Sequence, residues 1–196
     1  MYEKLNITEN HLQVLSLFTN GFDKEYYIRE VEKLLKISPR TAQLILENLE
    51  NKGIVESKMR GKIKSYALKR SISSQMYVAF AEQYKTIAFL EKTPMIKEII
   101  EKIIPAVDGV GVIFGSYAKG IAREESDLDI FVVGKYDNKV IKKVSKTYGI
   151  EIGVKCYPAK VFEKNLHSDI LLKEMLKNHL LFLNLGLFVR MVMKNG

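Results

Sequence analysis

The first 53 residues contain three runs in which apolar residues recur every three or four positions, the spacing of one buried helix face. In ITENHLQVLSLF this face holds Leu12, Leu15 and Phe18, with Thr8 or Asn6 as the expected N-cap. The second run is YYIREVEKLL. The third, KISPRTAQLILENLENKG, opens with a Ser-Pro pair suited to an N-cap and a first helical residue, and a glycine ends it. Its buried stripe is expected at Ala42, Ile45, Leu46 and Leu49.

Two short alternating runs follow, IVESKM and IKSYAL, separated by RGK. Alternation on both sides of a short polar segment is typical of a β-hairpin. Three helices followed by a hairpin resemble the winged-helix family, which includes many bacterial and archaeal transcription regulators. The resemblance covers residues 5–70 and implies a third helix that reads base edges in the major groove of double-stranded DNA.

Basic residues gather where such a fold would meet DNA. Between residues 52 and 70 the only acidic residue is Glu56. A basic hairpin lying along a phosphate backbone releases counterions when it binds. The residues expected to contact DNA are Arg40, Thr41 and Gln43 on the third helix and Lys58, Arg60, Lys62 and Lys64 on the hairpin. In the alternative reading the winged helix only mediates dimerisation and these lysines are solvated.

Residues 71–104 read as two helices, the second starting at Thr93-Pro94. The first is expected to be a connector or a dimerisation helix. We therefore predict an α+β protein with a winged-helix domain at 1–70, a helical connector at 71–93 and a further domain at 94–196.

Composition narrows the class of partner. The 196 residues carry a net charge of +8, which favours an anionic partner such as nucleic acid or nucleotide. No apolar run reaches the roughly 18 residues that span a bilayer, and the N-terminus lacks a signal-peptide core. We therefore expect a cytoplasmic protein with no membrane partner. The single cysteine, Cys156, is expected to be a packed apolar side chain.

The candidate chemistry lies in GSYAKGIAREESDLD, from Gly115 to Asp129. Runs that read as buried strands, 110–114 and 128–133, flank a segment suited to a short helix. A strand that enters a glycine and then a helix N-terminus forms an anion site, because unpaired backbone N–H groups point at the ligand. Gly115 lets the backbone approach a phosphate closely, and Ser116 adds a hydroxyl donor.

Two aspartates follow, Asp127 and Asp129. Residues two positions apart on a strand point to the same face, so the two carboxylates repel each other unless a cation lies between them. Hard oxygen ligands suit Mg²⁺, which usually combines one or two protein carboxylates with substrate phosphates. The segment therefore predicts a site for a metal-bound nucleoside triphosphate.

Gly115-Ser116 stands twelve residues ahead of Asp127-Leu128-Asp129, a spacing that resembles the signature of the DNA polymerase β-type nucleotidyltransferase superfamily, in particular its minimal branch. The resemblance runs from about Glu98 through the C-terminus and implies a mixed β-sheet with flanking helices. It places Gly115 and Ser116 on the triphosphate of an NTP, with ATP expected, and Asp127 and Asp129 on catalytic Mg²⁺ or Mn²⁺.

The family usually supplies a third carboxylate from the next strand, here GIEIGVKCY. The expected position holds Gly153 in this chain. Glu151 lies two residues earlier on the same face and is the expected substitute, since its side chain is longer.

Two functions remain open at this point. In the first, the protein transfers a nucleotidyl group from an NTP to an unknown acceptor, with a winged helix that binds DNA. In the second, it is a DNA-binding transcriptional regulator whose transferase-like domain is catalytically degenerate and acts as a nucleotide sensor or an antitoxin-like partner-binding module. Winged-helix regulators are often homodimers, and minimal nucleotidyltransferases often pair with a helical protein, so both partners are expected alternatives.

Overall fold

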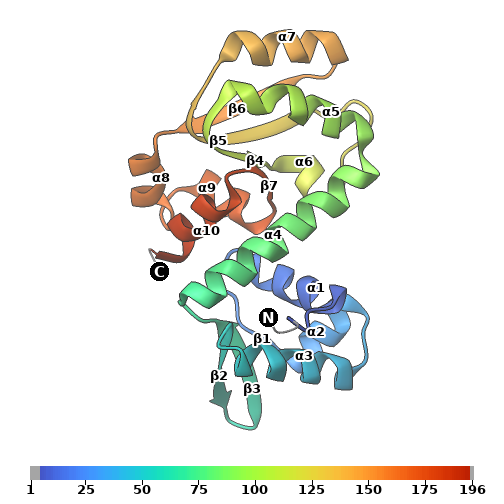
Figure 1. The fold of residues 1–196 in the computed structure, drawn as a ribbon, viewed down its shortest axis with the longest axis vertical. Coiled ribbons are helices and arrows are strands. Elements are labelled where there is room, and N and C mark those ends of the chain that lie inside the picture. The colour runs from blue at the N-terminus through green and yellow to red at the C-terminus, as the bar shows by residue number, and fades with distance from the viewer. Residues whose placement is uncertain (1–4, 195–196) are drawn as a thin grey trace. The chain divides into compact units, whose positions relative to one another are not determined.

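The computed structural model describes residues 5–194; residues 1–4 and 195–196, at the outer ends of the two expected domains, lie outside the described residues. The chain is mixed α+β and divides into two compact units, residues 1–81 and 82–196, each with its own sheet (Figure 1). The fold class expected from the sequence is confirmed. Helix α4 (Ile72–Lys92) contributes residues to both units, and the expected boundaries at residues 70 and 93 stay a prediction.

The first unit contains the three helices and the hairpin that the sequence predicts. Its elements are α1 (Glu9–Thr19), β1 (Tyr26–Tyr27), α2 (Ile28–Leu35), α3 (Pro39–Asn51), β2 (Val55–Arg60) and β3 (Ile63–Leu68). The strands form an antiparallel sheet in the order β1-β3-β2. One detail of the expectation is wrong: Tyr27 belongs to β1, where it pairs with Ser65, and not to the second helix. Tyr26 and Tyr27 pair with Tyr66 and Ser65 of β3, and this strand pairing takes precedence over their helical spacing.

Helix α3 begins and ends where its local signals indicate. The hydroxyl oxygen of Ser38 accepts a hydrogen bond from the Thr41 backbone N–H at 3.0 Å, and Pro39 is the first helical residue. Gly53 follows the helix with φ +67°, a left-handed conformation that glycine adopts without a Cβ penalty. The four residues expected on the buried stripe, Ala42, Ile45, Leu46 and Leu49, are all buried.

The second unit is built on a four-stranded sheet in the order β6-β5-β4-β7. Its strands are β4 (Val107–Ile113), β5 (Leu128–Tyr136), β6 (Ile152–Tyr157) and β7 (Leu180–Leu183). Its remaining elements are α5 (Pro94–Ile103), η1 (Ile104–Ala106), α6 (Gly115–Ala118), α7 (Asn138–Tyr148), α8 (Ala159–Asn165), α9 (Ile170–Lys177) and α10 (Leu185–Lys194). β5 and β6 are parallel, whereas β4 is antiparallel to both β5 and β7.

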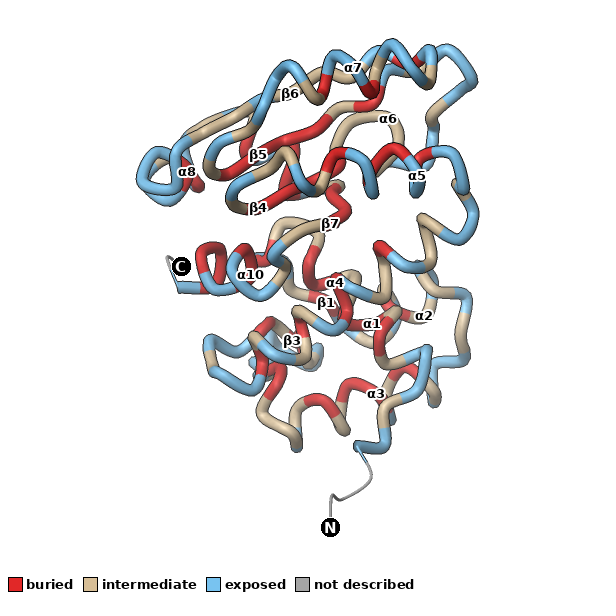
Figure 2. Tube along the Cα trace, turned by 45° about the horizontal axis from the view of Figure 1, so that its top comes forward, coloured by how far each residue is buried: buried red, intermediate tan, exposed pale blue. Residues whose placement is uncertain are grey.

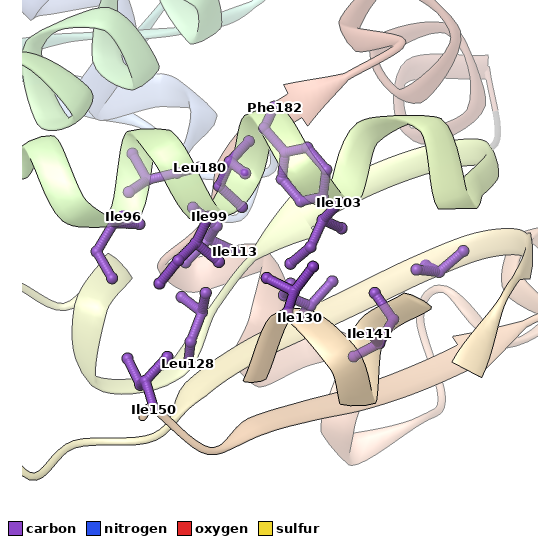
Figure 3. Packing of buried hydrophobic residues seen from close by; sticks show 13 residues of the cluster. Ile96, Ile99, Ile103, Ile113, Leu128, Ile130, Ile141, Ile150, Leu180 and Phe182 are labelled. Carbon is purple, nitrogen blue, oxygen red and sulfur yellow. The ribbon is translucent and has the colours of Figure 1, made fainter. Parts of the chain in front are cut away.

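The two faces of this sheet carry different cores. On one face Leu128, Ile130 and Val132 of β5 pack with the isoleucines of α5 and with Ile141 of α7 (Figure 3). On the other face Phe131 contacts the ring of Phe162 in α8 at a centroid distance of 6.1 Å. Because side chains alternate along a strand, Asp129 lies on the same face as Phe131. Figure 2 shows β4 and β5 mostly buried, while exposed and buried residues alternate along α7.

A buried charged group holds the C-terminal tail of this unit. Glu82 in α4 is fully buried; its two oxygens lie 3.2 Å from Nε2 of His179 and 2.9 Å from Nζ of Lys85. Beside them, the hydroxyl of Thr86 donates to the backbone carbonyl of Leu181 at 2.9 Å. The apolar run Leu180–Leu183 forms β7, a largely buried strand of the sheet.

No helix within residues 5–194 is both long and apolar enough to cross a membrane.

Candidate active site

The site is built where β4 ends and β5 begins. β4 ends at Ile113, and Gly115 follows with φ +70° at the start of the one-turn helix α6. A Cβ built on Gly115 would overlap Oδ2 of Asp129 and lie 2.9 Å from its Cγ. Real Cβ atoms do not come this close to other atoms, so the site requires glycine here both for its backbone conformation and for space.

Asp129 lies within the electrostatic reach of Asp127. Asp127 is exposed and Asp129 is half-buried. Burial raises the pKa of Asp129 above its ordinary value, and the negative charge of Asp127 raises it further, while Lys155 opposes both effects. A raised pKa means that the ionised form is disfavoured in the metal-free protein. A divalent cation between the two carboxylates would relieve this repulsion.

The neighbouring strand leaves space beside Asp129. In the parallel pairing of β5 with β6, Gly153 is the register partner of Asp129. A Cβ on Gly153 would lie 3.5 Å from Oδ1 of Asp129, an ordinary contact distance, and Gly153 is not among the glycines with a left-handed backbone. Gly153 therefore lies directly beside the carboxylate, at a position that accepts a side chain.

Glu151 is not drawn into the same cluster. It precedes β6, is exposed, and its carbonyl accepts a hydrogen bond from the Leu128 N–H at 2.8 Å. Within residues 5–194, no three His, Cys, Asp or Glu side chains gather so that they could hold a metal ion. The role of Glu151 as a third ligand stays a prediction.

The phosphate end of the site differs in one respect from the expectation. The sequence predicts a glycine followed by a helix N-terminus, but α6 starts at Gly115 itself and ends at Ala118. A single turn has a small dipole, so phosphate binding here would depend on close backbone approach at Gly115 and on the hydroxyl of half-buried Ser116. Phosphate contact by these two residues stays a prediction.

Two side chains near the carboxylates were not assigned to the site from the sequence. Lys155 lies two residues beyond Gly153 on the same strand face, and its charge lowers the pKa of Asp129. Tyr117 in α6 has its pKa raised by burial first and by the charge of Asp127 second. The alternation of β6 is a signal that could have identified Lys155, because residues 153 and 155 share a face.

In the first unit, two of the basic residues expected to bind DNA are already paired with acids. Nζ of Lys64 lies 2.7 Å from Glu50 of α3, and Nη2 of Arg60 lies 3.2 Å from Glu25. The hydrogen bond from Lys64 is the main reason that the pKa of Glu50 is lowered. The lysines at 58 and 62 are exposed. Phosphate contact by any of these residues stays a prediction.

The residues expected to read bases lie at the start of α3. The hydroxyl groups of Thr41 and Ser38 are 2.8 Å apart, so Thr41 takes part in the helix cap. Arg40 donates to the side-chain oxygen of Gln43 at 3.3 Å, and Gln43 donates to Glu47 at 2.8 Å. These contacts pre-order the polar surface of α3, while base contact stays a prediction.

Comparison with known proteins finds a family similarity in the second unit. Residues 94–180 match the family model described as a nucleotidyltransferase domain. The match begins at the first residue of α5 and ends at the first residue of β7, so it contains Gly115, Asp127 and Asp129. Residues 94–180 are therefore similar in sequence to the nucleotidyltransferase domain family.

Whole-chain comparisons add little to this. No curated protein matches the chain. Among solved structures the chain is similar to TrmBL2, an archaeal chromatin protein described as showing a novel mode of DNA binding, at 14% identity over 88% of this chain and 71% of that chain. The TM-score is 0.29, too low to transfer fold or function.

Proposed function

We propose that the protein transfers a nucleotidyl group from an NTP, with ATP expected, to an acceptor hydroxyl in a reaction that depends on Mg²⁺ or Mn²⁺. The observation that carries this proposal is the fit of Gly115 against Asp129, inside a segment that matches the nucleotidyltransferase domain family. That fit brings a backbone suited to phosphate approach next to a carboxylate suited to a metal ion.

The donor set suits a hard divalent cation. Asp127 and Asp129 offer only oxygen atoms, and the charge of the first raises the pKa of the second. When bound, such an ion supplies charge neutralisation for the phosphates and a lower pKa for an attacking hydroxyl. Among the described residues no further His, Cys, Asp or Glu side chain joins these two carboxylates as a metal ligand. The protein's own ligands therefore suit one ion held together with substrate oxygens.

The chain's own residues then divide the work of positioning. Gly115 and the hydroxyl of Ser116 contact the β- and γ-phosphates, and Lys155 adds a positive charge on the same sheet face. The acceptor oxygen forms a bond to the α-phosphorus while the bond from that phosphorus to its bridging oxygen breaks. Pyrophosphate leaves with the electron pair of the broken bond, and the proton of the acceptor hydroxyl passes to solvent. Positioning and charge stabilisation supply the rate enhancement.

The test uses ATP labelled at the α-phosphate, Mg²⁺ or Mn²⁺, and a cell extract as the source of acceptor. Label is expected on protein or nucleic acid with the wild type and not with Asp127→Asn or Asp129→Asn. Equal labelling by all three proteins contradicts the proposal. No labelling by any of them favours a degenerate domain that acts as a nucleotide sensor or as an antitoxin-like module bound to a helical partner protein.

A second function is proposed for the first unit, which we assign to the winged-helix class and to binding of double-stranded DNA. Three helices and a basic hairpin support it, with exposed Lys58 and Lys62 beside the hairpin turn. Because Arg60 and Lys64 are paired with acids, these two lysines are the expected phosphate contacts.

A band-shift titration at low salt tests this assignment. Lys58→Gln with Lys62→Gln is expected to weaken duplex binding and to flatten its salt dependence. Lys33→Gln, an exposed change on α2 away from the hairpin, is the matched control. Absence of binding to any duplex by the wild type at low salt contradicts the assignment and leaves dimerisation as the role of this unit.

A further inference from the structure

A pocket of about 320 Å³ opens between α5 and α7 in the second unit. It is lined by Lys102, Val140, Lys143, Val144, Thr147 and Tyr148. Both helices cover the sheet face that holds Ile130, whereas Asp129 points to the other face. The pocket is therefore separate from the candidate active site, and its volume lies at the lower end of the roughly 300–1,000 Å³ typical of small-molecule sites.

The lining combines an apolar floor with a cationic rim. Val140 and Val144 pack into the core below, and the ring of Tyr148 is also partly buried against that core. Lys102 of α5 and Lys143 of α7 both line the hollow, so it carries two positively charged residues from different helices. Two like charges at one hollow repel each other, and a bound anion relieves that repulsion.

All charged residues of α7 are lysines. This helix contains no acidic residue, and its other lysines, Lys139, Lys142 and Lys146, are all exposed. Two acids of α5 lie near the Tyr148 hydroxyl: Glu98, whose carboxylate accepts from it at 3.5 Å, and Glu101, whose charge also acts on it. The pocket is thus positively charged at Lys102 and Lys143, and carboxylates that can accept hydrogen bonds lie near the Tyr148 hydroxyl.

We propose that this pocket binds a mononucleotide unit, either as a free nucleotide or as the terminal nucleotide of a nucleic-acid strand. The phosphate lies between Lys102 and Lys143, where two cations can share its charge. The base lies over the valine floor beside the ring of Tyr148, and an exocyclic amino group donates to Glu98. Inorganic phosphate would leave the apolar floor uncovered, so an organic phosphate with a flat ring matches the lining better.

The proposal is tested by isothermal titration calorimetry on the full chain, with EDTA present to suppress metal-dependent binding at the carboxylates. The probes are AMP and a short single-stranded oligonucleotide that ends in a phosphorylated adenosine. Lys102→Gln with Lys143→Gln is expected to weaken binding about tenfold or more, since both charge-assisted phosphate contacts are removed. Lys142→Gln, the exposed neighbour that does not line the pocket, is expected to change it less than about twofold.

Each outcome of the titration either supports or overturns the proposed nucleotide pocket. Binding of AMP identifies a free nucleotide as a ligand, and binding of the oligonucleotide alone identifies a strand end. In both cases the double lysine variant must lose the affinity while Asp129→Asn keeps it. The proposal is overturned if neither probe binds at millimolar concentration, if Lys142→Gln weakens binding as much as the double variant, or if Asp129→Asn abolishes it. An unchanged circular dichroism spectrum shows that each variant is folded.

Discussion

Gly115 lies against the carboxylate of Asp129 so closely that no side chain fits between them. A Cβ at residue 115 would overlap Oδ2 and lie 3.1 Å from Cβ of Asp129. The glycine proposed to contact phosphate and the aspartate proposed to hold the metal ion are therefore in direct contact. The two parts of the sequence motif act as one structural unit, and a change in either should disturb both.

Gly115→Ala is accordingly expected to lower affinity for Mg²⁺-ATP by about tenfold or more. The added methyl group would overlap the carboxylate of Asp129, so that carboxylate must shift from its present position. Gly120→Ala is the matched control. Gly120 has nearly the same backbone conformation, φ +69°, but its Cβ position has open space around it. Both variants should lose thermal stability from backbone strain, and Gly115→Ala should lose more because its Cβ also overlaps Asp129. Equal loss of nucleotide affinity in the two variants contradicts the role given to the Gly115–Asp129 contact.

The space beside Asp129 predicts that an added carboxylate would strengthen Mg²⁺ binding. Gly153→Asp adds a third carboxylate at a position whose Cβ lies 3.5 Å from Oδ1 of Asp129. We expect tighter Mg²⁺ binding and faster nucleotidyl transfer, together with lower stability without metal, because three carboxylates repel one another. Gly153→Asn has nearly the same shape without the charge and serves as the control. If Asn produces the same changes as Asp, the effect is one of packing and the interpretation fails.

The buried group at Glu82 predicts a large stability difference between two similar ion pairs. Glu82→Ala removes the buried carboxylate that His179 and Lys85 both contact, which costs about 3–5 kcal/mol in the free energy of unfolding. Glu174→Ala removes an equally direct pair with Lys177, but both side chains are about half exposed, so little change is expected. Urea unfolding of the three proteins measures both. Similar losses for the two variants would show that burial does not decide the effect.

Asp169 predicts a dependence on pH. It caps α9 by accepting from the Leu172 N–H at 3.1 Å, which lowers its pKa, and it also accepts from the Tyr157 hydroxyl at 2.9 Å. A lowered pKa in the folded state gives stability that is present above the unfolded-state value and is lost as the pH falls through the folded-state value. Asp169→Ala should therefore cost about 1 kcal/mol near neutral pH and progressively less below about pH 4.

Asp169→Asn provides the comparison for that titration, since asparagine caps a helix without carrying a charge. Its stability relative to Asp169→Ala should stay nearly constant as the pH falls. A difference between wild type and Asp169→Ala that is the same at neutral and acidic pH contradicts the capping role of the carboxylate.

Local signals made parts of the fold predictable. Helix α3 was placed correctly because Ser38, Pro39 and Gly53 act through their own backbone and nearest neighbours. The hairpin was predicted for the same reason, since alternation and a tight turn are local properties. In the site, the strand that carries Asp129 was predicted from its apolar run, whereas Asp127 precedes β5, so its placement on the same face as Asp129 stays a prediction.

Features that depend on distant parts of the chain were not predictable. The strand β7 pairs with β4 across the whole domain, and its apolar residues look the same in a buried helix as in a buried strand. Similarly, Lys64 and Glu50 become partners only when β3 lies beside α3, so counting charges along the sequence overstated the free positive charge of the hairpin. The space at Gly153 was read as a missing ligand, and its distance from Asp129 required the register of β5 and β6.

The most direct test of the central claim is a calorimetric titration of the wild type and Asp129→Asn with ATP, each with and without Mg²⁺. The account predicts that ATP binds the wild type with an affinity that rises when Mg²⁺ is present, and that Asp129→Asn loses this rise while remaining folded. Equal Mg²⁺ dependence in both proteins would contradict the assignment of Asp129 as a metal ligand and, with it, the proposed nucleotide site.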